Sequence, residues 1–193
     1  MNTNGNGHAL LAPGEGEVLE AAGSRLVIKI ASPSQFVAEY TAPPHFAGPP
    51  LHVHPGFDET FLVIEGRLAL TVRGEPAALT PGATAYVSGH VPHTFRNPAG
   101  EPARFLLICS PGGMEQYFRG IAVGDNELVA AIAERVGYRV VSDQPAEMKA
   151  PARRQSPRAG SRASAGRVGW GELQQCAVNA RASRVAVRGI SPI

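Results

Sequence analysis

The sequence predicts a single mostly β domain, a sandwich or barrel of short strands, followed by two helices and a basic tail. Three observations support this. The chain has 193 residues, about the length of one domain. Its 22 Gly and 17 Pro residues favour many turns over a helical bundle. Short β-prone runs recur about every ten residues between Arg25 and Cys109, as expected of a sandwich or barrel.

Eight strands are predicted, separated by turns that contain Pro, Gly or Ser. They lie at residues 25–30, 35–41, 51–54, 59–66, 67–72, 83–88, 93–97 and 103–110. In the run at 59–66, Phe61 and Val63 fall on one strand face, and Leu62 and Ile64 fall on the other. Because both faces are apolar, we expect another sheet or another protomer to cover the outer face.

Two helices are predicted after Pro111, where the apolar spacing changes from two residues to about four. They lie at residues 113–122 and 126–138. Asp125 or Asn126 is positioned to cap the start of the second helix. We expect both helices to pack against the barrel.

This organisation divides the chain into four segments. A lead segment covers residues 1–24, the β-barrel 25–110, the C-terminal helices 111–146 and the tail 147–193. The first three together carry 9 Lys and Arg against 14 Asp and Glu, a net charge of −5, whereas the tail carries 9 against 2, a net charge of +7. The basic character of the chain therefore belongs to the tail.

The tail is predicted to be disordered because it has no sustained apolar period. Arg, Ala, Ser, Gly and Pro account for 30 of its 47 residues. Nucleic-acid binding is disfavoured, since Trp170 is the only aromatic residue of the tail and its arginines are scattered. A frameshift in a GC-rich gene is a further interpretation, because out-of-frame translation of such a gene is rich in the same residues.

Membrane and secreted classes are disfavoured. The chain has no run of 18 apolar residues, and residues 1–14 lack the basic and apolar parts of a signal peptide. We therefore expect a soluble, cytoplasmic protein. Cys109 and Cys176 are the only cysteines, too few for a disulfide scaffold or a cysteine-based zinc site. A metal ion would have to be held by histidine and carboxylate.

Four residues have the chemistry and spacing for such a site. His52 and His54 stand two apart in a β-prone run, so both imidazoles project from the same strand face. After a turn, Glu59 begins the next strand, and His93 lies on a separate hairpin. Three imidazoles and a carboxylate suit a divalent first-row ion, with Fe, Mn, Ni, Co, Cu and Zn all open. A six-coordinate ion would also have room for water, oxygen or a substrate atom.

These residues belong to two motifs that resemble the paired motifs of the cupin superfamily. The motifs are HxHxxxxExxxxxxG, formed by His52, His54, Glu59 and Gly66, and GxxxxxSxHxxHxxxN, formed by Gly82, Ser88, His90, His93 and Asn97. The resemblance covers residues 45–110. It implies a double-stranded β-helix, or jelly-roll barrel, with a metal ion inside, held by His52, His54, Glu59 and His93.

The motifs depart from the family pattern at three positions. The family usually has Pro at the position of Ser88 and Gly at that of His90, and its opening Gly lies further upstream than Gly48. The departures at Ser88 and His90 predict an altered turn before His93, but His93 itself is kept as a ligand. Residues 112–122 are similar to a segment that follows the barrel in single-domain bacterial cupins often labelled quercetin-dioxygenase-like.

The leading hypothesis is a metal-dependent dioxygenase that acts on a small aromatic or enolisable molecule. Glu59 is its candidate catalytic residue, because a carboxylate whose pKa is raised by burial could accept a substrate proton. Two alternatives stay open: a metal-dependent isomerase or epimerase, and a non-catalytic small-molecule-binding cupin. The apolar faces of the 59–66 strand and the habit of cupins also predict a homodimer.

Other residues have less specific interpretations. His45 and His90 are expected in loops near the barrel mouth, either solvated or in contact with substrate. Asp58 is expected in a turn, with replacement of Glu59 as ligand the alternative, and Cys109 in the apolar core. Six aromatic residues are expected in the core or the pocket lining. They are Tyr40, Phe57, Phe61, Tyr86, Phe95 and Phe105.

Overall fold

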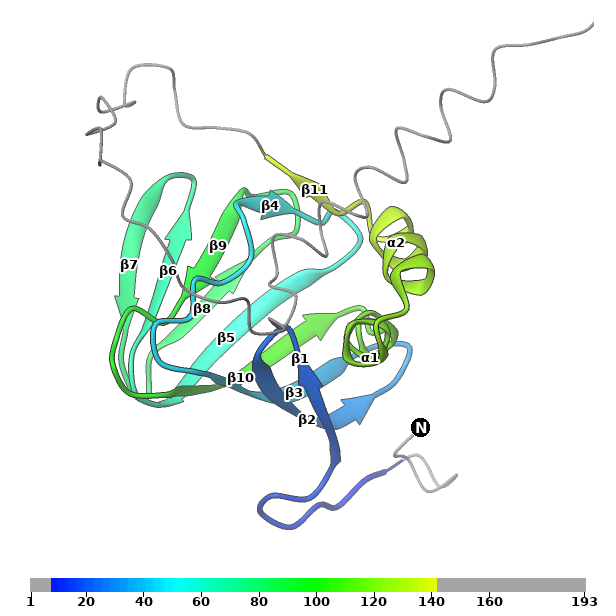
Figure 1. Cartoon of the computed structure of the whole chain (residues 1–193), viewed down its shortest axis with the longest axis horizontal. Coiled ribbons are helices and arrows are strands. Elements are labelled where there is room, and N and C mark those ends of the chain that lie inside the picture. Colours follow the sequence, from blue (N-terminus) through cyan, green and yellow to red (C-terminus); the bar gives the residue numbers. More distant parts are fainter. Residues whose placement is uncertain (1–7, 142–193) are drawn as a thin grey trace, which may run out of the picture.

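The fold, taken from a computed structural model that describes residues 8–141, consists of two antiparallel sheets packed face to face, with two helices at one side (Figure 1). The six-stranded sheet has the order β1 (Glu17–Ala21), β2 (Ser24–Ala31), β3 (Phe36–Ala42), β10 (Ala103–Ser110), β5 (Asp58–Glu65) and β8 (Thr84–Val87). The five-stranded sheet has the order β11 (Arg139–Val140), β4 (His52–Val53), β9 (His93–Arg96), β6 (Leu68–Val72) and β7 (Glu75–Leu79). The predicted all-β barrel with two C-terminal helices is confirmed.

Aromatic rings fill the space between the sheets. Phe95 of β9 lies with its ring centroid 5.4 Å from Phe61, 5.6 Å from Phe105 and 5.7 Å from Tyr40, all on the six-stranded sheet. All four side chains are at most 5 % exposed. Edge-on and tilted ring pairs of this kind add to the free energy of hydrophobic burial. This part of the core therefore consists of apolar side chains alone.

Strand β5 follows the predicted alternation. Phe61 and Val63 are fully buried on its inner face, whereas Leu62 and Ile64 on its outer face are half-buried. Tyr86 corrects the prediction that all six aromatic residues line the core or pocket, because it is 65 % exposed on the edge strand β8. Its neighbour Val87 takes the inward position instead.

Three strands were not predicted. β1 falls within the predicted lead segment and joins β2 through Ala22 and Gly23, whose φ angles of 51° and 80° are those of a tight hairpin turn. β7 contains Pro76, which an edge strand tolerates because it needs no hydrogen bond on its outer side. β11 is a two-residue strand after the helices that pairs with β4.

The helices are α1 (Glu115–Val123) and α2 (Asn126–Arg135). Asp125 caps α2, since its carboxylate accepts a hydrogen bond of 2.9 Å from the backbone N–H of Leu128. The prediction that this helix extends to residue 138 is wrong. Gly137, with φ of 69°, takes a left-handed conformation, and the chain turns back toward β4.

The predicted disordered tail, residues 147–193, lies outside the described residues. Within residues 8–141, no helix is long and apolar enough to cross a membrane.

Candidate metal centre

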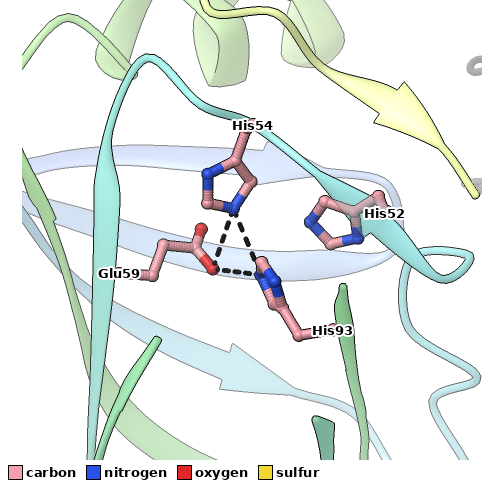
Figure 2. Close-up of side chains that lie close together, drawn as sticks. All are labelled: His52, His54, Glu59 and His93. Carbon is pink, nitrogen blue, oxygen red and sulfur yellow. Dashed lines mark hydrogen bonds and ion pairs between the residues drawn. The ribbon is translucent and has the colours of Figure 1, made fainter. Parts of the chain in front are cut away.

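The four predicted ligands meet inside the barrel (Figure 2). His52 comes from β4, His54 from the loop after it, Glu59 from the inner face of β5 and His93 from β9. Each is at most 6 % exposed, and one ligand atom from each lies within 4.8 Å of the others. The sheets thus place three imidazoles and a carboxylate around one point.

Strand pairing positions these side chains. His52 pairs directly with His93 across β4 and β9, which places their ring centroids 4.5 Å apart. His54 is fixed by its backbone N–H, which donates to the carbonyl of Gly89 at 2.8 Å. The loop that carries His54 is therefore held against the segment that leads to His93.

Gly89 allows this close approach because it has no side chain. A Cβ atom at this position would lie 2.2 Å from the carbonyl oxygen of Phe57 and 2.3 Å from that of His54. Any larger residue would push the loop that carries His54 away from the cluster. The departures from the family motif at Ser88 and His90 flank this glycine, and His93 still reaches the other three ligands.

Hydrogen bonds fix the tautomer of each imidazole. The Nδ1 atom of His52 lies 2.8 Å from the carbonyl oxygen of Pro50, that of His54 3.0 Å from Phe57 and that of His93 2.8 Å from Val91. Carbonyl oxygens only accept hydrogen bonds, so each Nδ1 carries the proton. In the neutral rings, every Nε2 then presents a lone pair, as metal-ligating histidines do.

The spacing of the Nε2 atoms fits a bound cation, and the repulsion between their lone pairs favours one. Those of His54 and His93 lie 3.1 Å apart, and two lone pairs at that distance repel unless a proton or a metal ion lies between them. Oε2 of Glu59 lies 3.0 Å from Nε2 of His93 and 3.5 Å from Nε2 of His54. Two donors bound about 2.1 Å from one ion at a right angle lie about 3.0 Å apart, so these separations fit a shared ion.

The pKa values of the cluster reflect its burial and its charges. Burial and the neighbouring imidazole of His93 lower the pKa of His52 from 6.5 to about 3, so His52 is neutral at pH 7. Burial opposes protonation of His54, but its hydrogen bond to Glu59 and the negative charge of that residue outweigh burial and raise its pKa.

Glu59 differs from its expected state. Burial does tend to raise its pKa, but the hydrogen bonds and charges of His54 and His93 outweigh burial, and the pKa lies well below its usual value. Glu59 is therefore a carboxylate at neutral pH, which is the form that binds a cation, but its lowered pKa makes it a weaker proton acceptor than expected from the sequence.

The other candidate residues are not members of the cluster. His45 and His90 are exposed. Asp58 faces the outside of β5, where it accepts hydrogen bonds from the hydroxyl of Tyr86 at 2.8 Å and the N–H of Gly89 at 3.0 Å. Cys109 is fully buried opposite Glu59, and burial, followed by the charge of Glu59, raises the pKa of its thiol well above the usual value. The cysteine is therefore an unreactive core residue.

Two aromatic residues complete the surroundings of the ligands. Phe57 stacks on His54 with a centroid distance of 3.8 Å and an interplanar angle of 4°, in line with its predicted place in the core or pocket lining. Tyr138 stacks on His52 at 4.9 Å and 25°. Tyr138 was missed as a residue of the site because the predicted helix included it. The signal that could have found it is Gly137, a helix-ending residue directly before it.

Comparison with known proteins identifies the domain. Residues 38–109 match the cupin domain family, and this range contains all four residues of the cluster. Residues 38–109 are a cupin domain. The matched range ends at residue 109, so the resemblance of residues 112–122 to quercetin-dioxygenase-like cupins stays a prediction. No curated protein matches the chain.

Several solved structures are similar to this chain. KdgF from Halomonas sp. is 17 % identical, and the alignment covers 56 % of this chain and 97 % of KdgF with a TM-score of 0.51. An RmlC-like cupin from Shewanella frigidimarina is 17 % identical, with coverage of 56 % and 95 % and a TM-score of 0.49. TT1209 from Thermus thermophilus is 26 % identical, with coverage of 53 % and 90 % and a TM-score of 0.41. At this identity, the similarity to KdgF supports the fold alone.

Proposed function

We propose that this cupin binds a divalent transition metal ion through His52, His54, Glu59 and His93 and acts as a dioxygenase on a small aromatic or enolisable molecule. The observation that carries the proposal is the buried cluster of three Nε2 lone pairs and one carboxylate, enclosed by aromatic rings. A bound first-row ion would supply Lewis-acid chemistry at this point and, for every candidate except zinc, redox chemistry. Its identity among Fe, Mn, Ni, Co, Cu and Zn stays open.

The residues of the centre have different roles. The three histidines are held by backbone carbonyls and keep fixed positions. Glu59 is ionised and lies among the ligands; it is the proposed acceptor of a substrate hydroxyl proton, a role that needs a pKa higher than the one it has in the metal-free protein. Phe57 and Tyr138 place aromatic rings against His54 and His52 and keep water from the cluster.

An isomerase or epimerase that acts on sugars would need further polar side chains in the barrel. Within residues 8–141, the only buried polar or charged residues besides the cluster are Ser24 and Asn97. The amide of Asn97 is already used, since it donates to the backbone carbonyls of Pro43 at 2.9 Å and Glu101 at 2.7 Å. The barrel therefore favours a largely apolar substrate.

Oxygen uptake tests this proposal. The metal-loaded protein is supplied with a panel of flavonols, diketones and catechols while dissolved oxygen and substrate are both measured. We expect at least one compound to be consumed together with oxygen. Conversion of a compound without oxygen uptake would support the isomerase instead. Binding without any conversion would indicate a non-catalytic binding protein.

We also propose that the protein forms a homodimer through the outer face of the six-stranded sheet. On this face, Leu62 and Ile64 of β5 and Leu106 and Ile108 of β10 are only half-buried in the single chain. Covering them would remove apolar surface from water. Light scattering at micromolar concentration should give twice the chain mass of 20.2 kDa. A monomer mass would contradict the proposal.

A further inference from the structure

The hydroxyl group of Tyr138 is buried without a hydrogen-bond partner in residues 8–141. Its oxygen exposes less than 1 Å² of surface, and neither a backbone nor a side-chain group of this part of the chain pairs with it. Buried polar groups are nearly always paired, so an unpaired one calls for an explanation, and a bound water or small molecule is one that fits a functional site.

The position of Tyr138 connects this hydroxyl to the metal centre. Its ring stacks on His52, one of the four ligands, at a centroid distance of 4.9 Å. The ring of Tyr117 on α1 lies beside that of Tyr138, with the two centroids 6.4 Å apart. A tyrosine phenol has an ordinary pKa near 10, so at neutral pH this hydroxyl group carries its proton and is a hydrogen-bond donor.

Backbone contacts hold Tyr138 in this place from both sides. Before it, the carbonyl of Val136 accepts a hydrogen bond of 2.8 Å from the N–H of Gly56, in the loop that carries His54. After it, β11 pairs with β4, with Val140 opposite His52. The N–H of Tyr138 itself donates to the carbonyl of Ala133 at 2.8 Å. The segment is thus fixed to the loop that carries His54 and to strand β4, which holds the backbone of Tyr138 in place before any small molecule binds.

We infer that Tyr138 helps to bind a small molecule at the metal centre. Its hydroxyl group donates a hydrogen bond to an oxygen atom of that molecule. The inference rests on the proposed function, because that function brings a molecule with a phenolate, enolate or carbonyl oxygen to the four ligands. Such an oxygen accepts hydrogen bonds, and a neutral phenol can supply one. Tyr138 would then select molecules that present an acceptor oxygen on the side of His52.

The variant Tyr138→Phe tests the inference, because it removes the hydroxyl and keeps the stacked ring. The probe is 4-nitrocatechol, titrated without oxygen into the metal-loaded protein while its visible absorption is recorded. We expect the Kd of the variant to rise about tenfold or more, as for loss of a hydrogen bond to a charged oxygen, and the visible band of the bound probe to shift. Metal content should equal that of the wild type.

Tyr86→Phe is the matched control, since it removes a tyrosine hydroxyl that lies outside the barrel on Asp58. Its Kd should equal that of the wild type. An unchanged Kd in Tyr138→Phe, or no binding of the probe to metal-loaded wild-type protein, would overturn the inference alone. Wild-type protein that takes up no metal would overturn both the inference and the proposed function.

Discussion

His54→Ala and His93→Ala should each lose most of the bound metal while the protein remains folded. Each substitution removes one of only four donors. Loss even of a group that merely orients a metal ligand typically costs about 10- to 100-fold in affinity, so loss of a ligand should cost at least that much. The core of Phe61, Phe95 and Phe105 between the sheets does not depend on the ion.

Metal per chain, measured by mass spectrometry after dialysis against a weak chelator, checks this result. Circular dichroism of the same samples reports the fold. His45→Ala and His90→Ala are the matched controls, because both imidazoles are exposed and lie outside the cluster. They should keep full metal content. Stoichiometric metal in either His54→Ala or His93→Ala would show that the four-ligand assignment is wrong.

The ligands could be predicted from the sequence because their signals are local. His52 and His54 stand two apart in a β-prone run, and Glu59 follows after one turn. Such a spacing places side chains on a shared face whatever the rest of the fold does. The long apolar strands were predicted for the same reason, since the alternation in β5 is visible within eight residues.

The missed features depend on contacts between distant residues. β7 has no β-branched residue and β1 has only Val18, so the strand conformation of both comes from pairing with β6 and β2. The role of Gly89 depends on carbonyl groups of His54 and Phe57, more than thirty positions earlier in the chain.

The place of Tyr138 also depends on contacts between distant residues and could not be predicted from local sequence. The four-residue apolar spacing runs through Val136, so helix periodicity alone extends α2 to Tyr138. The left-handed Gly137 and the pairing of β11 with β4 outweigh that periodicity and place the ring on His52. No local pattern encodes a strand of two residues whose partner lies almost ninety positions away.

The bound metal should leave the protein as the pH falls from about 7 to 4, because an imidazole must be neutral to coordinate an ion. Protonation of His54 begins the release of the metal ion. Its pKa is raised in the metal-free protein, so a proton competes for its Nε2 atom already above the ordinary value of 6.5. Below that pKa, each unit of pH weakens binding about tenfold for one competing proton. His52, with a pKa of about 3, adds no competition in this range.

Metal content after equilibration at each pH, followed by gel filtration, measures this release. The barrel should stay folded, because protonated His54 beside the Glu59 carboxylate replaces the positive charge of the ion. Circular dichroism at pH 5 should therefore match that at pH 7, and readjustment to pH 7 with added metal should restore full occupancy. His90→Ala, which removes an exposed imidazole, should release metal along the same curve as the wild type. Occupancy unchanged down to about pH 4 would contradict histidine ligation, since unperturbed imidazoles are fully protonated there.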